Sequence, residues 1–234
     1  MKLSNNTAII PARAGSKRIE KKNSKLLCGQ PLVEWTIQQA YQSQLFGKII
    51  LSTDDEFLMQ NYASDSRLIV HKRNPSSSSD EAPMSKVITD VISSFNLTGF
   101  ICLLQPTSPL RRASDIVDSY SLLRSTAAES VVSVRRARHP RQWSFSQGNF
   151  LTEAFVNGVD GKQSQNLTYQ YELNGAIYWY CVDKYLIEKR QLMVGAAIFE
   201  MPYWSSIDID DITDFMLCEL IFSADDNIFG GRQA

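Results

Sequence analysis

Short apolar segments of strand length alternate along this chain with segments of helical periodicity, and this alternation restricts the fold more than any other feature. The first strand-like segments are residues 8–10, 48–52, 68–71, 100–104 and 130–134. Apolar residues recur at helical spacing between them, for example over residues 33–41 and 116–123. Strands that alternate with helices form βαβ units, whose mainly parallel sheet is covered on both faces. The sequence therefore predicts an α/β fold.

The second half of the chain interrupts this alternation and then resumes it. Residues 135–168 carry scattered glycines and aromatic residues without a helical pattern. We interpret 135–170 as a β-rich arm or lobe inserted into one domain of residues 1–234, and we expect it to pack against a second copy of the chain. A long surface loop is the alternative. Further strands are predicted at 174–182 and 196–201, a short helix at 183–190, and a final helix at 212–222 with Ile212, Met216 and Leu220 on one face.

Composition excludes several classes of protein. The chain of 234 residues is 44% hydrophobic and 21% charged, with a net charge of −1, as in an ordinary globular protein. Such a balance does not favour a nucleic-acid partner, so anion binding must come from local clusters. No apolar run approaches the ~20 residues that cross a membrane, and the first residues lack a signal-peptide pattern. We therefore expect a cytoplasmic protein, with the widely spaced Cys28, Cys102, Cys181 and Cys218 reduced.

The loop after the first strand is densely cationic. Arg13, Lys17, Arg18, Lys21 and Lys22 follow within ten residues, with a single glycine, Gly15. Neither G-x-G-x-x-G nor G-x-x-x-x-G-K-[ST] is present, so a phosphate grip here would be made by side chains. Arg13 can bind phosphate oxygens bidentately, and Lys22 can act as a mobile point charge. A solvated basic turn is the alternative interpretation.

A polar turn follows the strand at 100–104. Gln105, Thr107 and Ser108 place neutral donors and acceptors at the strand end, between two prolines that stiffen the turn. Such a loop can recognise the edge of a base. Alternatively, it is only a strand-to-helix turn with Ser114 as the helix N-cap.

The segment SIDIDD, residues 206–211, is the sharpest acidic feature. In an extended chain Asp208 and Asp210 lie on the same side, close enough to share one hard cation such as Mg²⁺. Asp211 points away and can cap the final helix with Thr213. A capping and solubility role is the alternative, but a triphosphate-binding loop elsewhere in the chain favours magnesium.

Other catalytic classes lack their motifs. His71 and His139 are the only histidines, and G-x-S-x-G, C-x-x-C and H-E-x-x-H do not occur. A catalytic triad and a zinc site are therefore not expected.

Five segments in order resemble the CMP-sialic acid synthetases, also called acylneuraminate cytidylyltransferases. They are IPARAGSKRIEKKN at 10–23, STD at 52–54, LLQPTSPLR at 103–111, NGAIY at 174–178 and SIDID at 206–210. The resemblance implies a Rossmann-like three-layer nucleotidyltransferase fold, with a mainly parallel sheet and a small dimerisation lobe. It also implies a homodimer that uses Mg²⁺ to transfer CMP from CTP to a nonulosonic (sialic-acid-like) sugar, making a CMP-activated sugar for surface glycans.

The same resemblance implies roles for individual residues. Those that would bind CTP are Arg13, Ser16, Lys22, Asn23, Arg73, Ser85 and Gln105. Those that would contact the sugar are Gln105, Thr107, Ser108, Tyr171 and Asn174. Asp208 and Asp210 would hold the metal, and together with Arg13 and Lys22 they would be catalytic.

The chain departs from the family pattern near the expected sugar site. Glu172 stands where family members often have Arg, and Arg141 follows His139–Pro140 where Lys is common. Arg18 and Glu20 replace a frequent Gly and Pro, so the first loop is more charged than usual. These differences leave open another 2-keto-3-deoxy acid, such as Kdo, pseudaminic or legionaminic acid, as the acceptor. A nucleotide-sugar glycosyltransferase and a catalytically silent sugar-binding subunit are more distant alternatives.

Overall fold

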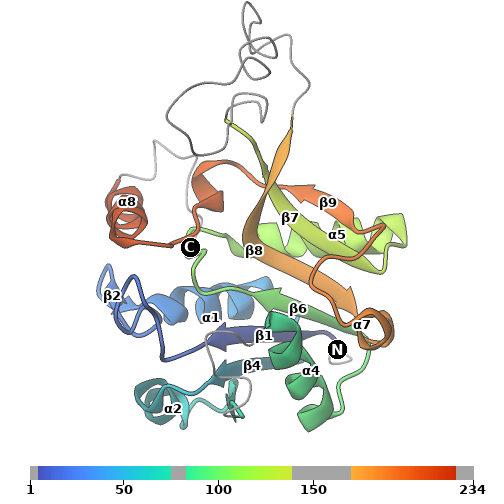
Figure 1. Cartoon of the computed structure of the whole chain (residues 1–234), viewed down its shortest axis with the longest axis horizontal. Helices are drawn as coiled ribbons and strands as arrows, with labels where there is room; N and C mark the ends of the chain where they lie inside the picture. Colours follow the sequence, from blue (N-terminus) through green and yellow to red (C-terminus); the bar gives the residue numbers. More distant parts are fainter. Residues whose placement is uncertain (1–4, 75–82, 139–169, 225–234) are drawn as a thin grey trace, which may run out of the picture.

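The computed structural model describes residues 5–74, 83–138 and 170–224, and in them a seven-stranded sheet organises the chain (Figure 1). The strands of this sheet, in chain order, are β1 (Thr7–Ala12), β4 (Lys48–Thr53), β5 (Ile69–Lys72), β6 (Phe100–Leu104), β7 (Ser130–Arg136), β8 (Tyr171–Cys181) and β9 (Ala197–Glu200). The helices are α1 (Leu32–Ser43), α2 (Glu56–Tyr62), α4 (Met84–Phe95), α5 (Ala113–Thr126), α7 (Val182–Glu188), α8 (Ile212–Ser223) and the 3₁₀ turn η3 (Trp204–Ser206).

The strand order is β5-β4-β1-β6-β8-β7-β9, and β8 alone runs against the others. Each strand-like segment of the sequence corresponds to one of these strands, so the mainly parallel α/β prediction is confirmed. The carboxyl ends of β5, β4, β1 and β6 meet at one edge because these strands are parallel. Ligands in such sheets bind outside that edge.

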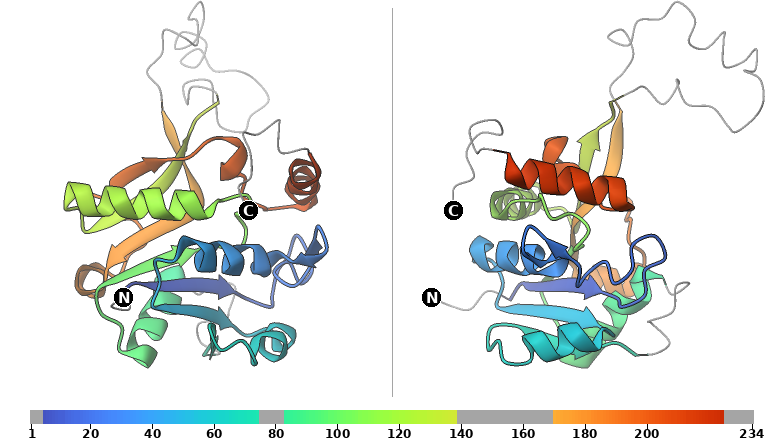
Figure 2. Two further views of the ribbon diagram at one scale, coloured as in Figure 1. Left: turned by 180° about the vertical axis from the view of Figure 1, so that it is seen from behind. Right: turned by 90° about the vertical axis from the view of Figure 1, so that its left-hand side faces the viewer.

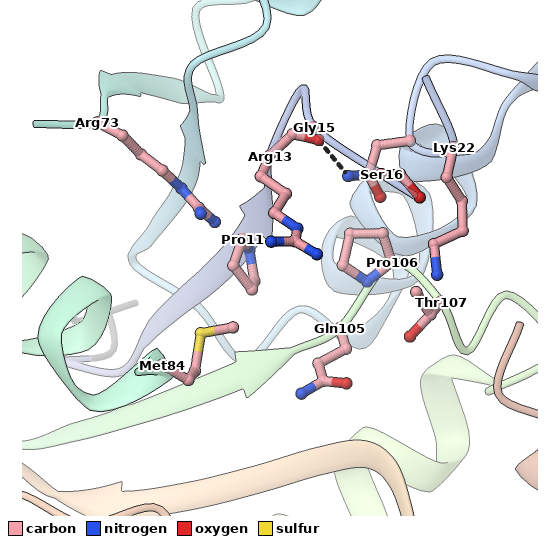
Figure 3. A pocket seen from close by; sticks show the side chains of 11 residues that line it. Pro11, Arg13, Gly15, Ser16, Lys22, Arg73, Met84, Gln105, Pro106 and Thr107 are labelled. Carbon is pink, nitrogen blue, oxygen red and sulfur yellow. Dashed lines mark hydrogen bonds between the residues drawn. The ribbon is translucent and has the colours of Figure 1, made fainter. Parts of the chain in front are cut away.

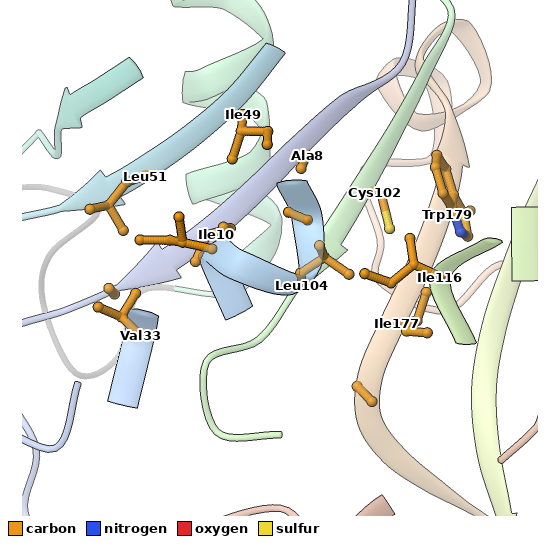
Figure 4. Packing of buried hydrophobic residues seen from close by; sticks show 14 of the residues in the cluster. Ala8, Ile10, Val33, Ile49, Leu51, Cys102, Leu104, Ile116, Ile177 and Trp179 are labelled. Carbon is orange, nitrogen blue, oxygen red and sulfur yellow. The ribbon is translucent and has the colours of Figure 1, made fainter. Parts of the chain in front are cut away.

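Helices cover both faces of the sheet and make three layers (Figure 2). On one face, Val33 of α1 packs beside Ile10 and Leu51 of β1 and β4, and Ile116 of α5 lies beside Leu104 of β6 and Ile177 of β8 (Figure 4). On the other face, α4 packs on β1 and α7 packs on β8, in one cluster with Ile9 and Ile50. Both faces of the central strands are therefore buried, which explains why these strands are continuous apolar runs.

A third apolar cluster joins distant parts of the chain at the edge where the strands end. A small hairpin, β2 (Leu26–Leu27) and β3 (Gln30–Pro31), packs there against α8. The buried members of the cluster are Ile19, Leu27, Leu32, Leu110, Ile207, Ile209, Phe215, Cys218 and Ile221. The cluster holds the basic loop, the turn after β6 and the acidic segment together.

The face of the final helix that packs on this cluster is not the face that the sequence predicted. Phe215, Cys218 and Ile221 are buried, whereas Ile212, Met216 and Leu220 are exposed. Apolar residues occur on nearly every side of ITDFMLCELIFS, so spacing alone could not identify the buried face. The packing of Phe215 against the hairpin decides it.

Two helix starts test the predicted caps. Asp211 is the N-cap of α8 and accepts the backbone N–H of Thr213 at 2.8 Å, as predicted. Asp214 completes this capping box by accepting the Asp211 N–H. The N-cap of α5 is Arg112, so the alternative that made Ser114 the cap is wrong. Asp115 accepts the Arg112 N–H at 2.8 Å and so fixes the start of the helix two residues earlier.

Other expectations are met in part. All four cysteines are free thiols, although Cys28 is exposed. The inserted arm lies almost entirely outside the described residues. In the part of the chain that the structure describes, no helix combines the length and apolar character needed to cross a bilayer.

Candidate active site

The loops after β1, β4 and β6 meet at the carboxyl edge of the sheet. The basic loop is fastened there by its backbone, because the Ala14 N–H donates to Asp54 Oδ1 at 2.8 Å. Asn23 is buried, and its Nδ2 donates to the Arg13 carbonyl at 2.9 Å. These two bonds keep the start of the loop in place and leave the Arg13 side chain half-exposed at the cavity.

A central cavity of about 170 Å³ lies over these strand ends. Its wall is formed by Pro11, Arg13, Gly15, Ser16, Lys22, Asn23, Arg73, Met84, Gln105, Pro106 and Thr107. Figure 3 shows the charged ends of Arg73, Arg13 and Lys22 extending into the space beside the Gln105 amide. The structure thus brings together most of the residues predicted to bind a nucleotide.

Arg73 is the buried cation of this wall. It is 6% exposed, and its Nε donates to the Ser52 carbonyl at 3.1 Å. Burial lowers the pKa of Arg73 to about 10, an effect opposed by the nearby Asp54 carboxylate. The guanidinium remains charged near neutral pH and contributes a fixed positive charge.

Lys22 joins the basic loop to the acidic segment, 187 residues further along the chain. Its Nζ donates to the Ile209 carbonyl at 2.7 Å. Burial lowers the pKa of Lys22, while Asp208 and Asp210 oppose that shift. A second, basic cavity of about 220 Å³ surrounds this link and is lined by Arg13, Ser16, Lys17, Arg18, Lys22 and Asp210.

The acidic segment has the predicted alternation. Ile207 and Ile209 enter the third apolar cluster, and the Ile209 N–H donates to the Thr107 carbonyl at 2.7 Å. Asp208 and Asp210 consequently face the other way, toward Lys22. Burial raises the pKa of Asp208, and a hydrogen bond from the Thr107 side chain opposes this.

This carboxylate pair fits a magnesium ion. Asp208 Oδ1 is buried and has no hydrogen-bond partner, so it is an oxygen available to a cation. Among the described residues no cluster of three or more metal-binding side chains occurs. Magnesium usually takes only one or two carboxylates and completes its shell with water and substrate phosphates. Two aspartates beside a phosphate-sized cavity suffice for that arrangement.

A third, acidic cavity of about 340 Å³ opens on the far side of the pair. It is lined by Arg135, Leu173, Asn174, Tyr203, Ser206, Ile207, Asp208, Asp210, Asp214 and Leu217. Asp210 also lines the basic cavity, and the basic and central cavities share Arg13, Ser16 and Lys22. The three cavities therefore adjoin one another around the Asp208–Asp210 pair.

Asn174 lies at this acidic cavity, but its side chain is part of a buried network. Its Oδ1 accepts from Ser133 Oγ at 2.6 Å, and its Nδ2 donates to Ser206 Oγ at 2.9 Å. Asn174 is only 3% exposed. It fastens the start of the acidic segment to β7 and β8.

Three other predicted residues lie away from the cavity walls. Ser108 is fully buried, with no hydrogen-bond partner for its hydroxyl. Tyr171 pairs with Arg136 at the start of β8, and a hydrogen bond to Glu200 raises the pKa of its phenol. Ser85 follows the cavity residue Met84 in the first turn of α4, and its carbonyl accepts from Tyr185. Neighbours of these residues, rather than the residues themselves, line the cavities.

Arg111 and Arg18 are site residues to which the sequence reasoning assigned no role. Arg111 is 1% exposed and donates to the carbonyls of Gln105 and Ala176. It also donates to Thr36 Oγ1 and Gln39 Oε1 on α1, and so holds the Gln105 turn against two other elements. Arg18 forms an ion pair with Asp210 at 3.1 Å. The family-like block at 103–111 ends at Arg111, but its contacts depend on residues distant in sequence.

Gly175 adopts a backbone conformation that most residues avoid, directly beneath the site. Its φ is +74°, and a Cβ there would lie 3.2 Å from Gln105 Oε1 and 3.6 Å from Asp208 Oδ2. We predict that Gly175→Ala lowers the free energy of unfolding by about 1–2 kcal/mol. Displacement of Gln105 should also reduce turnover by about 10-fold, measured at saturating substrate.

Gly195→Ala is the matched control for this change. Gly195 has φ +81°, but nothing lies within 4 Å of a Cβ built there. This variant should show the backbone strain without loss of turnover. Equal turnover in the two variants would mean that Gly175 is needed only for its backbone conformation and not for the position of Gln105.

The strand ends of this α/β sheet carry buried and half-buried cations, a polar turn and a carboxylate pair. This combination is typical of the nucleotidyltransferase class. The sequence model described as Cytidylyltransferase matches residues 7–156. The chain belongs to the cytidylyltransferase family and groups with its CMP-sialic acid synthetases, as the five sequence blocks predicted.

Two curated proteins are similar to this chain, and the alignment covers different shares of their lengths. The N-acylneuraminate cytidylyltransferase of Escherichia coli O18:K1:H7 is 34% identical over 214 residues, 90% of this chain. The chain spans about half the length of that protein (50%). The CMP-N,N′-diacetyllegionaminic acid synthase of Legionella pneumophila is 31% identical over 91% of this chain and 94% of its own length.

A solved structure confirms the fold. The CMP:2-keto-3-deoxy-manno-octonic acid synthetase complexed with CTP superposes with a TM-score of 0.69 at 16% sequence identity. The alignment covers 94% of this chain and 99% of that one. The three-layer architecture is therefore that of a known nucleotidyltransferase fold.

Proposed function

We propose that this protein transfers CMP from CTP to the anomeric hydroxyl of a nonulosonic acid and releases pyrophosphate. One observation carries the proposal. Lys22 of the basic loop donates to the Ile209 carbonyl between Asp208 and Asp210, so a phosphate-binding loop and a metal-type carboxylate pair form one site. Family membership and the full-length similarity to the Legionella synthase support the same reaction.

Each cavity takes one part of the reaction in this proposal. The central cavity binds the nucleoside, where the Gln105 amide offers both a donor and an acceptor to the cytosine edge. The basic cavity binds the phosphates through Arg13 and Lys22. The acidic cavity, on the far side of Asp208 and Asp210, binds the acceptor sugar.

The chemical step is an in-line displacement at phosphorus. The anomeric oxygen forms a bond to the α-phosphorus, and the bond from that phosphorus to the bridging oxygen breaks. Pyrophosphate leaves, and the hydroxyl proton is released to solvent. Negative charge increases on the non-bridging oxygens and on the leaving group. Arg13 and Lys22 are positioned to stabilise that charge because both line the basic cavity.

Asp208 and Asp210 would hold magnesium, which when bound would supply positive charge to the phosphates. The unpartnered Asp208 Oδ1 supports this assignment. We further infer a homodimer joined through the 135–170 arm. It is supported by β7 and β8, which remain paired as far as Arg136 and Tyr171.

The test is pyrophosphate release by the purified chain with CTP, Mg²⁺ and a panel of acceptors. The panel contains N-acylneuraminic, diacetyllegionaminic, pseudaminic and 2-keto-3-deoxy-octonic acids, with a neutral hexose as control. We expect one acid to support release and to be recovered as its CMP conjugate, and we expect UTP to support little.

Release that is independent of the acceptor would indicate a hydrolase. No release, combined with tight binding of a CMP-sugar, would favour the glycosyltransferase alternative. Either result would overturn the proposed function.

A further inference from the structure

The acidic cavity contains one cationic side chain among the described residues that line it. That residue is Arg135 of β7, and it shares the lining with three acidic residues, Asp208, Asp210 and Asp214. An anionic ligand entering a cavity of this composition is repelled unless positive charge is present within it. Arg18, which pairs with Asp210, and a metal ion at the Asp208–Asp210 pair would offset part of that charge, and Arg135 adds positive charge on the cavity wall itself.

Arg135 is held in a defined orientation but remains accessible. Its Nε donates to Glu172 Oε2 at 3.0 Å, and the two residues are register partners on β7 and β8. The Tyr203 ring lies 5.0 Å from the guanidinium carbon. The side chains of Arg135 and Glu172 are 28% and 48% exposed, so solvent and ligands can reach them.

The β7–β8 pair places Arg135 on the sheet face that the acidic segment covers. Residues two apart on a strand share a face. Ser133 and Asn174 contact each other on this face, and Arg135 and Glu172 lie two residues further along the same two strands. The bond from Asn174 to Ser206 fastens the acidic segment over it. Arg135 and the carboxylate pair therefore belong to the same cavity.

We propose that Arg135 binds the carboxylate of the acceptor sugar and selects acid sugars over neutral ones. This inference rests on the proposed function. In a 2-keto acid sugar the same carbon carries the attacking hydroxyl and the carboxylate, so the carboxylate must enter the cavity that contains Asp208 and Asp210. A planar guanidinium matches a carboxylate with two parallel hydrogen bonds.

Glu172 is the positioning partner in this arrangement. A guanidinium has five N–H donors, and the bond to Glu172 uses the one on Nε. The fixed Nε orients the planar group, and the guanidinium carbon lies over the Tyr203 ring. The carboxylate of Glu172 also partly neutralises Arg135 when no acceptor is bound.

The experiment compares the best acid acceptor of the panel with its C1 carboxamide, which retains the attacking hydroxyl but lacks the charge. We expect the wild type to prefer the acid by about 100-fold in kcat/KM, as a charge-assisted pair of hydrogen bonds permits. Arg135→Met should lower kcat/KM for the acid by a similar factor and change that for the amide less than about 3-fold. The KM for CTP should stay within about 2-fold of wild type in Arg135→Met.

Arg136→Met is the matched control, because Arg136 is the next residue of β7 and is exposed beside Tyr171. It should leave the acid preference unchanged. An Arg135→Met variant that loses activity equally with the acid and the amide would overturn the inference and leave the proposed function intact. Absence of pyrophosphate release with every acceptor would overturn both the inference and the proposed function.

Discussion

The double replacement Asp208→Asn and Asp210→Asn is expected to reduce turnover on the order of 1,000-fold or more while the fold survives. The two carboxylates are the described groups best placed to hold magnesium beside the triphosphate, and Asn keeps their shape without their charge. Stability should be unchanged or slightly higher, because Asp208 is largely buried and burial already disfavours its charged form. Pyrophosphate release and urea unfolding measure the two effects separately.

Asp118→Asn is the control for the same chemical change, since Asp118 is exposed on α5, outside the three cavities. It should behave as wild type. Binding of Mn²⁺ in the presence of CTP, followed by electron paramagnetic resonance, should be weakened in the double variant and normal in the control. Near-normal turnover in the double variant would refute the metal assignment.

Arg111→Met is expected to destabilise the protein by about 2–4 kcal/mol. The change removes a buried donor from the Ala176 carbonyl, Thr36 Oγ1 and Gln39 Oε1, while the Gln105 carbonyl keeps the Ser108 N–H. Each unsatisfied acceptor costs about 1–3 kcal/mol, and removal of the buried charge offsets part of the sum. The midpoint and slope of urea unfolding give the free energy directly.

Arg111→Lys should not restore stability, because one ammonium cannot reach acceptors on β8, α1 and the Gln105 turn together. Arg124→Met on the exposed surface of α5 should change stability by less than about 0.5 kcal/mol. A loss below about 1 kcal/mol in Arg111→Met would show that the guanidinium contributes little to holding the Gln105 turn against α1 and β8.

Local sequence patterns predicted most of the fold because strand and helix periods are read from neighbouring residues. The central strands are apolar on both faces, so continuous apolar runs such as the one that contains Ile9 and Ile10 reveal them even when the neighbouring strands are not known. The same reasoning failed for α8, where apolar residues surround the helix and only packing against the hairpin selects Phe215. It also missed the hairpin, whose strands have only two residues each.

The residues of the candidate site also differ in how far local sequence predicted them. Arg13, Lys22 and the Asp208–Asp210 pair were identifiable because each sits in a short segment of unusual charge. The family resemblance implied sugar contacts for Ser108 and Tyr171, but Thr107 and Leu173 line the cavities in their place. Spacing along the chain places a residue at a strand end without giving the direction of its side chain.

The sequence by itself determined the α/β class, the family and the chemical character of the basic loop and the acidic pair, since these depend on residue type and local period. The tertiary structure alone decided which groups meet. Lys22 and Ile209 are 187 residues apart, and Arg135 and Glu172 are 37 apart. Strand register and the third apolar cluster create those contacts, and no local pattern encodes them because their partners are chosen by packing.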